Sequence, residues 1–344
     1  MNKTKAINYD KMNYGFSLLK MLLAFEVVLG HFCNWKEYDT LLLWPFRELV
    51  SLAVPSFVII SFYLMERSIL SRNDEKYKTR LIKLLIPQVG WAFIYWFVYL
   101  MCSVLFSKDL PHSFTDLLWQ IFTGHSTTLN ATMCYQVDII VLTIIYYSIF
   151  RKLDDRKGYI AIVILTLFAY FMQYSLINYN LFKDLRFELK YPLGRIIEMI
   201  PYATIGFSFK YFNILEKIKK YWYLAIPVSA FMFLQGFKIA WYDVKDFGFA
   251  GICKPYLAIW IVIAAFSVPL EILPLTLKKI ILQVTNYTLG IYCCHRMINT
   301  LLDAFVPNLP LMSFERCILI YIISYILCYL ISLIPNKNIE SLIN

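Results

Sequence analysis

The sequence predicts an all-α protein, a polytopic transmembrane helical bundle of about ten transmembrane (TM) helices whose N-terminus and C-terminus are both cytoplasmic. Of its 344 residues, 60% are hydrophobic and only 16% are charged. That composition supplies too little polar surface for a water-soluble domain of this length. The apolar residues also gather into runs that are long enough to cross a bilayer. The lipid bilayer is therefore the expected solvent of this chain.

The predicted spans are continuous apolar segments separated by short polar connections. In chain order they are residues 16–33, 49–65, 84–106, 135–150, 159–177, 192–209, 221–237, 249–270, 280–301 and 317–334. The segment 113–122, SFTDLLWQIF, is too short to span and has apolar side chains on one side, which predicts a helix lying in the membrane interface. Residues 1–344 are expected to form a single membrane domain, with a cytoplasmic leader at 1–15 and a cytoplasmic tail at 335–344.

Basic residues set the predicted orientation. Lys and Arg are concentrated in the leader and in the even-numbered connections, which places these segments in the cytoplasm. The densest cluster follows the second span and contains Arg67, Arg72, Lys76, Lys78, Arg80 and Lys83. The formal charge of +10 is distributed over short clusters and not along one stripe, so nucleic acid is not an expected partner. Membrane lipids are, and the cluster is explained either as a topology determinant or as a phosphate-binding segment.

Cysteines and histidines do not form a metal-binding pattern. The eight cysteines lie mostly inside apolar runs and include no C-x-x-C pair. We interpret them as small buried packing residues, and no metal site is expected. The leader is followed by no small-residue cleavage site, so the first span is expected to remain in the mature protein.

Ionisable side chains inside a membrane span are costly and usually face a cavity or a partner. The first span contains Lys20, Glu26 and His31. Lys20 and His31 are eleven residues apart, so they share one face of a helix and lie about 16 Å apart along its axis. Glu26 points about 140° away from His31 on the helical wheel and is expected to pair with a neighbouring helix.

The predicted topology sorts the remaining ionisable groups into two layers. The outer layer contains His31 of the first span together with Asp138, Arg195, Glu198, Lys254, His295 and Arg296. The inner layer contains Lys20, Arg80 and Lys83. Histidines and carboxylates suit proton transfer, whereas a cluster of cations suits a phosphate-bearing ligand. Simpler structural roles also exist, because a membrane histidine can bond to a neighbouring helix and residues 195 and 198 can neutralise each other at i, i+3 spacing.

Several segments, taken in order, carry a family resemblance. KMLLAFEVVLGH places Lys20 and His31 at the spacing of an Arg, ten residues, then His motif. VPSFVIISFYLM, RLIKLLIP and TMCYQVDIIVLTII follow, and then EMIPYATIGFSF and TNYTLGIYCCHRMI, which contains Tyr292 and His295. In these segments the chain resembles membrane acyltransferase family 3, whose O-acetyltransferase-like members modify cell-surface polysaccharides. Lys20 and Lys83 stand where the family pattern has arginine, which exchanges a planar two-point phosphate ligand for a point charge.

The resemblance implies a membrane-bound acyltransferase (O-acetyltransferase) in the cell (plasma) membrane. It would transfer an acyl group, expected to be acetyl, from cytoplasmic acyl-CoA to a hydroxyl of an extracytoplasmic or lipid-linked glycan. The implied acyl-CoA site consists of Lys20, Arg80 and Lys83, and the implied catalytic residues are His31 as general base with His295 and Tyr292. Acyl-CoA is a co-substrate, and no cofactor is expected. Surface-polysaccharide biosynthesis proteins are candidate partners.

Alternatives remain open at the level of mechanism and of function. Transfer can be direct or can pass through an acyl-histidine or acyl-serine, for which Ser61 is a weaker candidate because it also suits helix packing. A polar path between a basic inner layer and a mixed outer layer would also serve a transporter or flippase of a glycan or glycolipid. A non-catalytic scaffold of a surface-polysaccharide assembly is a third alternative. Binding of acyl-CoA separates the first class from the other two.

Overall fold

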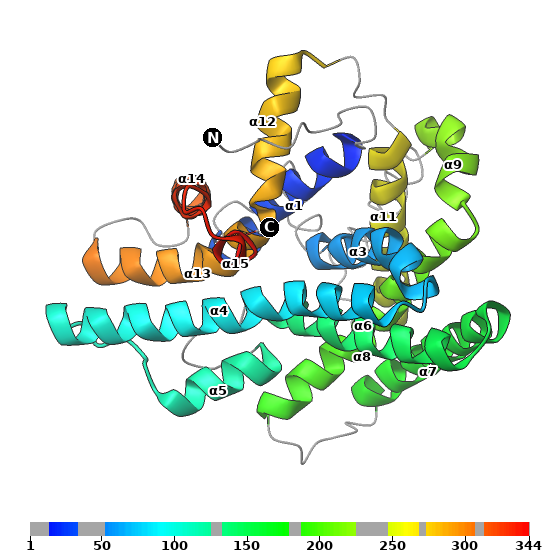
Figure 1. Cartoon of the computed structure of the whole chain (residues 1–344), viewed down its shortest axis with the longest axis horizontal. Coiled ribbons are helices and arrows are strands. Elements are labelled where there is room, and N and C mark those ends of the chain that lie inside the picture. The colour runs from blue at the N-terminus through cyan, green and yellow to red at the C-terminus, as the bar shows by residue number, and fades with distance from the viewer. Residues whose placement is uncertain are drawn as a thin grey trace.

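The structure is a computed structural model, and it describes residues 14–33, 52–124, 133–178, 187–224, 247–267, 273–306 and 313–343. All regular elements in these segments are helices (Figure 1). They are α1 (Tyr14–Phe32), α3 (Ala53–Leu70), α4 (Asp74–Phe106), α5 (Phe114–Thr123), α6 (Cys134–Lys152), α7 (Asp155–Asn178), α8 (Phe187–Tyr211), α9 (Ile214–Ile218), η2 (Lys219–Leu224), α11 (Phe247–Ser267), α12 (Leu275–Asn286), α13 (Thr288–Phe305), α14 (Phe314–Ser332) and α15 (Lys337–Glu340).

Helix length and surface chemistry support the membrane assignment. Within the described segments, α1, α3, α4, α6 and α14 are long and apolar enough to cross a bilayer. They overlap the first four predicted spans and the tenth, although α4 begins at Asp74, ten residues before the predicted span 84–106. Large apolar side chains are exposed on the outer faces of the helices, among them Phe93, Phe97, Leu167, Phe171, Ile322 and Leu330. Such extensive apolar exposure suits contact with lipid and not with water.

The helix predicted over residues 280–301 is divided in two. Helix α12 ends at Asn286 and α13 begins at Thr288, and the two helices run in different directions (Figure 1). At the junction Tyr287 has φ −106° and ψ 6°, and its amide donates to the carbonyl of Val284 at 3.0 Å, an i→i−3 bond that closes the helix end. The expectation of one continuous span is therefore wrong here. The interfacial helix predicted at 113–122 is confirmed as a helix by α5.

Two predicted segments cannot be compared with the structure. The predicted leader at 1–15 falls almost wholly before the first described residue, and most of the span predicted at 221–237 lies outside the described segments.

Close helix packing holds the centre of the bundle together. Helix α3 packs along α8, and α1 packs against α3, α11, α12 and α13. At the α3–α8 crossing, a Cβ atom on Gly206 would overlap the carbonyl oxygen of Ile59. A glycine is needed there because the two backbones are almost in contact, as in many membrane helix pairs.

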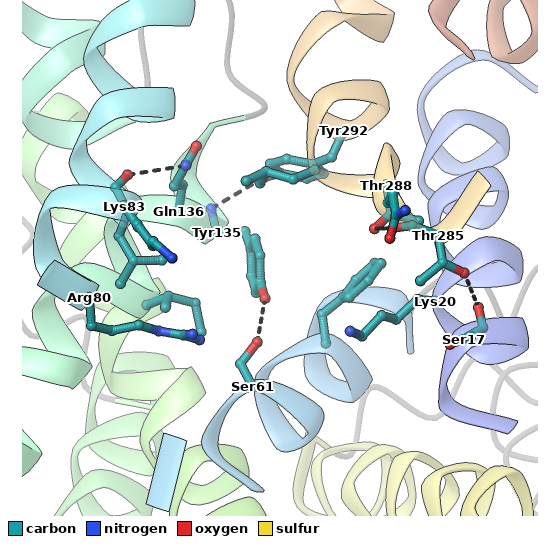
Figure 2. A pocket seen from close by; sticks show the side chains of 15 residues that line it. Ser17, Lys20, Ser61, Arg80, Lys83, Tyr135, Gln136, Thr285, Thr288 and Tyr292 are labelled. Atoms are coloured by element: carbon teal, nitrogen blue, oxygen red, sulfur yellow. Dashed lines mark hydrogen bonds between the residues drawn. The ribbon is translucent and has the colours of Figure 1, made fainter. Parts of the chain in front are cut away.

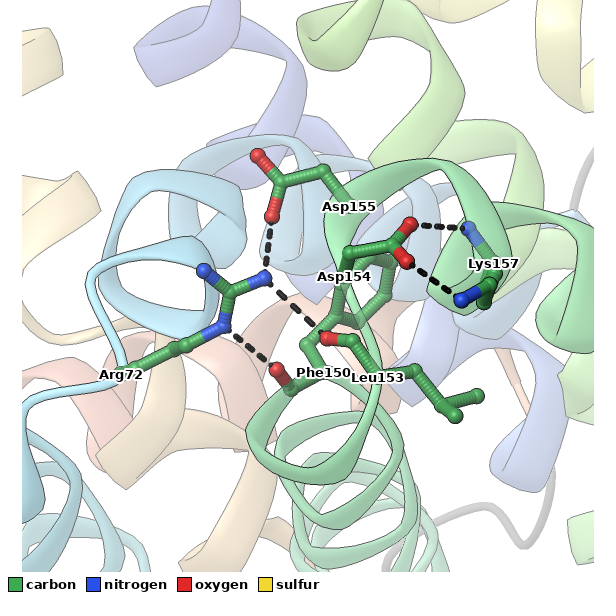
Figure 3. Close-up of polar contacts among 6 residues, drawn as sticks. All are labelled: Arg72, Phe150, Leu153, Asp154, Asp155 and Lys157. Atoms are coloured by element: carbon green, nitrogen blue, oxygen red, sulfur yellow. Dashed lines mark hydrogen bonds and ion pairs between the residues drawn. The ribbon is translucent and has the colours of Figure 1, made fainter.

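A polar clasp connects the loop after α3 to the loop after α6 (Figure 3). Arg72 donates from Nε to the carbonyl of Phe150 at 2.7 Å and from Nη2 to the carbonyl of Leu153 at 3.1 Å. The same Nη2 lies 2.5 Å from Oδ1 of Asp155. The guanidinium therefore satisfies carbonyl groups at the C-terminal end of α6, where a cation is favoured. Because α4 starts two residues after Arg72, the clasp fixes the start of α4 relative to α6.

Candidate functional site

A cavity of about 590 Å³ lies where α1, α3, α4, α6 and the α12–α13 junction meet (Figure 2). Its size falls within the range of about 300–1,000 Å³ that is typical of small-molecule sites. The break at Tyr287 contributes to this lining, because Thr285 and Asn286 precede it and Thr288 follows it. Irregular backbone at membrane depth is tolerated where it borders such a cavity.

Lys20, Arg80 and Lys83 all line this cavity. Figure 2 shows Lys20 on the wall formed by α1, across from Arg80 and Lys83 on α4. None of the three forms an ion pair with a carboxylate in the described part of the chain. The Nε atom of Arg80 is buried and has no hydrogen-bond partner there. A cavity lined by cations without a carboxylate partner is chemically suited to an anion, which would compensate their charge.

Hydrogen bonds between helices hold the cavity walls in place (Figure 2). The hydroxyls of Ser61 and Tyr135 lie 3.0 Å apart and join α3 to α6. Gln136 donates from Nε2 to the carbonyl of Leu84 at 3.2 Å and joins α6 to α4. The Thr285 hydroxyl donates to the carbonyl of Ser17 at 2.7 Å and so connects α12 to α1. The hydrogen bond to Tyr135 gives Ser61 a structural role.

The two membrane histidines are in direct ring contact. The rings of His31 on α1 and His295 on α13 are stacked, with centroids 5.5 Å apart and planes inclined at 28°. His295 is fully buried, and Nη2 of Arg296 lies 3.2 Å from Nδ1 of His31. The structure thus brings together the three ionisable groups His31, His295 and Arg296, which the sequence placed in one layer but not in contact.

Tyr292 connects the cavity to the histidine pair. Its side chain lines the cavity, and its ring centroid lies 6.1 Å from that of His295, one helical turn away. The backbone amide of Tyr135 donates to the Tyr292 hydroxyl at 3.3 Å. Lys20 and His31 share one face of α1 about 16 Å apart along the axis, so the cationic cavity and the histidines lie at two depths of the same helix.

Sequence reasoning missed Tyr95. Its hydroxyl donates to the carbonyl of Cys293 at 2.6 Å and accepts from the amide of Met297 at 3.0 Å. These two backbone groups would pair with each other in a regular α-helix, so the phenol is inserted into the hydrogen-bond ladder of α13 around His295 and Arg296. The only indication in the sequence is a tyrosine in the middle of an apolar span, and a buried tyrosine hydroxyl usually finds a partner.

The other predicted outer-layer residues separate into different environments. Asp138 is buried and pairs with Arg195, with Nη2 and Oδ2 3.3 Å apart. The ion pair of Arg195 with Asp138 links α8 to α6, and Glu198, three residues further along α8, is exposed. Lys254 belongs to α11, and its side chain is outside those that the structure describes. No group of three His, Cys, Asp or Glu side chains suited to a metal ion occurs in the described segments.

The fold and the site define a membrane-embedded helical protein with a cationic cavity beside a histidine pair. A family model described as an acyltransferase domain matches residues 13–333, nearly the whole chain. The chain therefore belongs to acyltransferase family 3, which confirms the resemblance drawn from the motifs and makes the protein an acyltransferase. Searches of curated proteins and of solved structures found no match.

Proposed function

We propose that this acyltransferase moves an acetyl or related acyl group from cytoplasmic acyl-CoA to a hydroxyl of an extracytoplasmic or lipid-linked glycan. The observation that carries the proposal is the set of three cavity cations, Lys20, Arg80 and Lys83, which have no carboxylate partner among the described residues. Coenzyme A carries several phosphate charges, and phosphate oxygens are the preferred partners of arginine and lysine. The cavity supplies these cations next to Tyr292 and the histidine pair.

The proposed reaction needs a base, which we place beyond Tyr292, the cavity-lining residue that lies next to His295. With the phosphates on the cations, the pantetheine arm extends past Tyr292 towards His31 and His295. A neutral imidazole takes the proton of the acceptor hydroxyl while its oxygen bonds to the thioester carbonyl carbon. The carbon–sulfur bond then breaks, and the thiolate receives that proton. An acyl ester and free coenzyme A result.

The proposed setting is the plasma membrane, with about ten spans and both termini in the cytoplasm. The five helices already long and apolar enough to cross a bilayer support part of this arrangement. The Arg72 clasp lies just before the start of α4, the helix that carries Arg80 and Lys83, and this basic helix end supports a cytoplasmic location for it.

Transfer of radiolabelled acetyl from acetyl-CoA to cell-envelope glycan tests the proposal in membranes that contain the protein. Arg80→Gln and Lys20→Gln are expected to raise the KM for acetyl-CoA at least tenfold, because each removes one phosphate ligand. Lys78→Gln is the matched control, since Lys78 belongs to the same basic segment but pairs with Glu75 outside the cavity. Equal increases in the KM for acetyl-CoA in all three variants would show that the basic residues act as topology determinants and do not form a donor site.

The helix break beside the cavity favours one rival function. Discontinuous helices often border the substrate site of a transporter, and Tyr287 interrupts α12–α13 where the cavity is lined. A glycan transporter has no need of acyl-CoA. Wild-type protein that binds no acetyl-CoA, transfers no label and yet moves a lipid-linked glycan between leaflets would replace the acyltransferase proposal with this one. Absence of all three activities would favour a scaffold.

A further inference from the structure

Arg296 determines which nitrogen of His31 carries the proton. A guanidinium group has only donors, so the 3.2 Å contact between Nη2 of Arg296 and Nδ1 of His31 requires a lone pair on Nδ1. A neutral imidazole then has its hydrogen on Nε2. His31 is thereby held as an N–H donor, and its only lone pair is occupied by the guanidinium.

His295 has the opposite arrangement. Its Nδ1 lies 3.1 Å from the carbonyl oxygen of Ile291 one turn earlier in α13. A carbonyl can only accept, so Nδ1 carries the hydrogen and Nε2 carries the lone pair. His295 is fully buried, and its Nε2 has no hydrogen-bond partner within the described residues. Buried polar atoms are usually paired, and an unpaired one requires a functional or structural explanation.

We propose that His295, and not His31, is the general base of this transferase, that His31 is an N–H donor, and that Arg296 is its positioning residue. This inference rests on the function proposed above and assigns roles within the same site. Nε2 of His295 takes the proton from the acceptor hydroxyl, whose oxygen bonds to the thioester carbon. The thiolate of coenzyme A leaves and receives the proton back from His295. The Nε2–H of His31 is available to donate to the carbonyl oxygen as its negative charge develops.

The reverse assignment conflicts with the observed contacts. If Nδ1 of His31 accepted a proton, an N–H group would face the N–H group of Arg296 at hydrogen-bond distance, and the two donors would repel each other. A proton on Nε2 of His295 meets no such donor among its described contacts. The ring stacking keeps the two imidazoles side by side, as the proposed action on one substrate requires.

Amide substitutions test the two roles in the full-length protein in membranes. His295→Asn keeps an N–H near the Ile291 carbonyl but has no lone pair at the position of Nε2, and His295→Gln places a non-basic amide there. Both are expected to lower kcat by about 100-fold or more with little change in the KM for acetyl-CoA, the usual scale for loss of a general base. His31→Gln places an amide N–H at the position of Nε2 and is expected to retain kcat within about tenfold.

Arg296 is tested through its dependence on His31. Arg296→Met releases the His31 tautomer and is expected to lower kcat about tenfold in the wild-type background. In the His31→Gln background the same substitution should have no further effect, because an amide has no tautomer to select. A purely structural role of Arg296 would give equal losses in both backgrounds and would overturn its assignment as a positioning residue.

Nitrogen-15 NMR of histidine-labelled protein reports the tautomer of each imidazole independently of any activity measurement. The chain has only four histidines, so His31→Gln and His295→Gln assign the two membrane signals. The expected spectrum shows Nε2–H for His31 and Nδ1–H for His295. Nε2–H on both rings, or high activity of His295→Asn with an inactive His31→Gln, would overturn the base assignment alone. Wild-type protein that neither binds nor uses acetyl-CoA would overturn the proposed function and, with it, both roles.

Discussion

The phenol oxygen of Tyr95 on α4 lies 3.0 Å from the backbone nitrogen of Met297 on α13. That nitrogen would otherwise bond within its own helix, to the carbonyl of Cys293, which Tyr95 also engages. The two helices are therefore joined through a backbone site that brackets His295. Because α4 also carries Arg80 and Lys83, one helix positions two of the three cavity cations and contacts the helix that carries His295.

Tyr95→Phe is expected to lower kcat for acyl transfer strongly and the free energy of unfolding only slightly. Without the hydroxyl, the Met297 amide and the Cys293 carbonyl can pair directly, so the change in unfolding free energy should stay within about 1 kcal/mol. Closing this turn rotates His295 relative to His31, and kcat should fall about tenfold or more. Tyr146→Phe is the control, because its hydroxyl bonds Thr204 at 2.5 Å on α8. A parallel loss of activity in both variants would contradict the prediction.

Gly206→Ala is expected to destabilise the bundle. The added methyl group would overlap the carbonyl of Ile59, and α3 and α8 would have to separate. Overpacking of this kind costs about 1–3 kcal/mol, or more where backbone must move. Gly194→Ala provides the comparison on the same helix, since no atom lies within 4 Å of its added Cβ. Thermal unfolding in detergent measures both, and equal melting temperatures would exclude the close approach.

Lys20→Arg and Lys83→Arg are expected to tighten binding of acyl-CoA. Arginine offers two parallel N–H groups to a phosphate where lysine offers a point charge. Each substitution should lower the KM for acetyl-CoA by about threefold to tenfold and leave kcat nearly constant. Lys78→Arg, outside the cavity, should change neither value. An increase in KM for both cavity variants would show that lysine is required for fit and not merely for charge.

Arg72→Gln is expected to destabilise the protein more than Asp155→Asn. The first substitution removes bonds to the Phe150 and Leu153 carbonyls as well as the ion pair, whereas the second removes only the ion pair. The pair is about half exposed, with 39% and 51% of the two side chains accessible, so its own contribution is small. A difference of about 1 kcal/mol in unfolding free energy is expected. Equal unfolding free energies of the two variants would show that the ion pair alone accounts for the stabilising effect of the clasp.

Acid is expected to weaken the start of α7 through Asp154. Its Oδ1 accepts from the backbone amide of Lys157 at 2.9 Å, and its Oδ2 lies 3.2 Å from the Lys157 ammonium (Figure 3). Hydrogen bonds from the backbone and side chain of Lys157 lower the pKa of the Asp154 carboxyl below its ordinary value. Near and below the ordinary pKa of about 3.9, the unfolded state therefore binds more protons than the folded state. The contribution of the Asp154 carboxylate to the free energy of unfolding decreases as pH falls through this range and is lost below the lowered pKa.

Asp154→Asn separates this effect from helix capping. Asparagine is also a good N-cap, so unfolding near neutral pH should change little. Only the part of the acid dependence below about pH 4 should diminish. Denaturant unfolding followed across that range checks the prediction. An unchanged acid dependence in Asp154→Asn would show that other carboxyls account for it.

Much of the fold and part of the site follow from the sequence. The apolar runs predicted α1, α3, α4, α6 and α14 because each is long enough and uniform enough to require lipid. The spacing of Lys20 and His31 predicted a shared helix face, and the motif order predicted the family that the comparison confirms. Lys20, Arg80 and Lys83, which the sequence placed in one inner layer, line one cavity together with Tyr292, and their proposed roles stay predictions.

The sequence did not predict which polar side chains pair between helices. Helical periodicity assigns a side chain to a face and a depth, but several polar partners are available at the same depth. Arg195 on α8 pairs with Asp138 on α6, and Arg296 contacts His31, which is 265 positions away in the chain. The break at Tyr287 likewise depends on the hydrogen bonds around it and not on an intervening proline or glycine.

The sequence by itself indicated a membrane protein, located the five helices that are long and apolar enough to cross a bilayer, and put Lys20, Arg80 and Lys83 in one predicted layer. Only the tertiary structure decided which ionisable groups touch and, through the contacts of Arg296 and Ile291, which imidazole nitrogen keeps a lone pair. The physical reason is the separation along the chain of the residues that decide each feature. Burial and helix periodicity are set by neighbours along the chain, whereas a hydrogen bond requires two atoms to meet within about 3 Å across different helices.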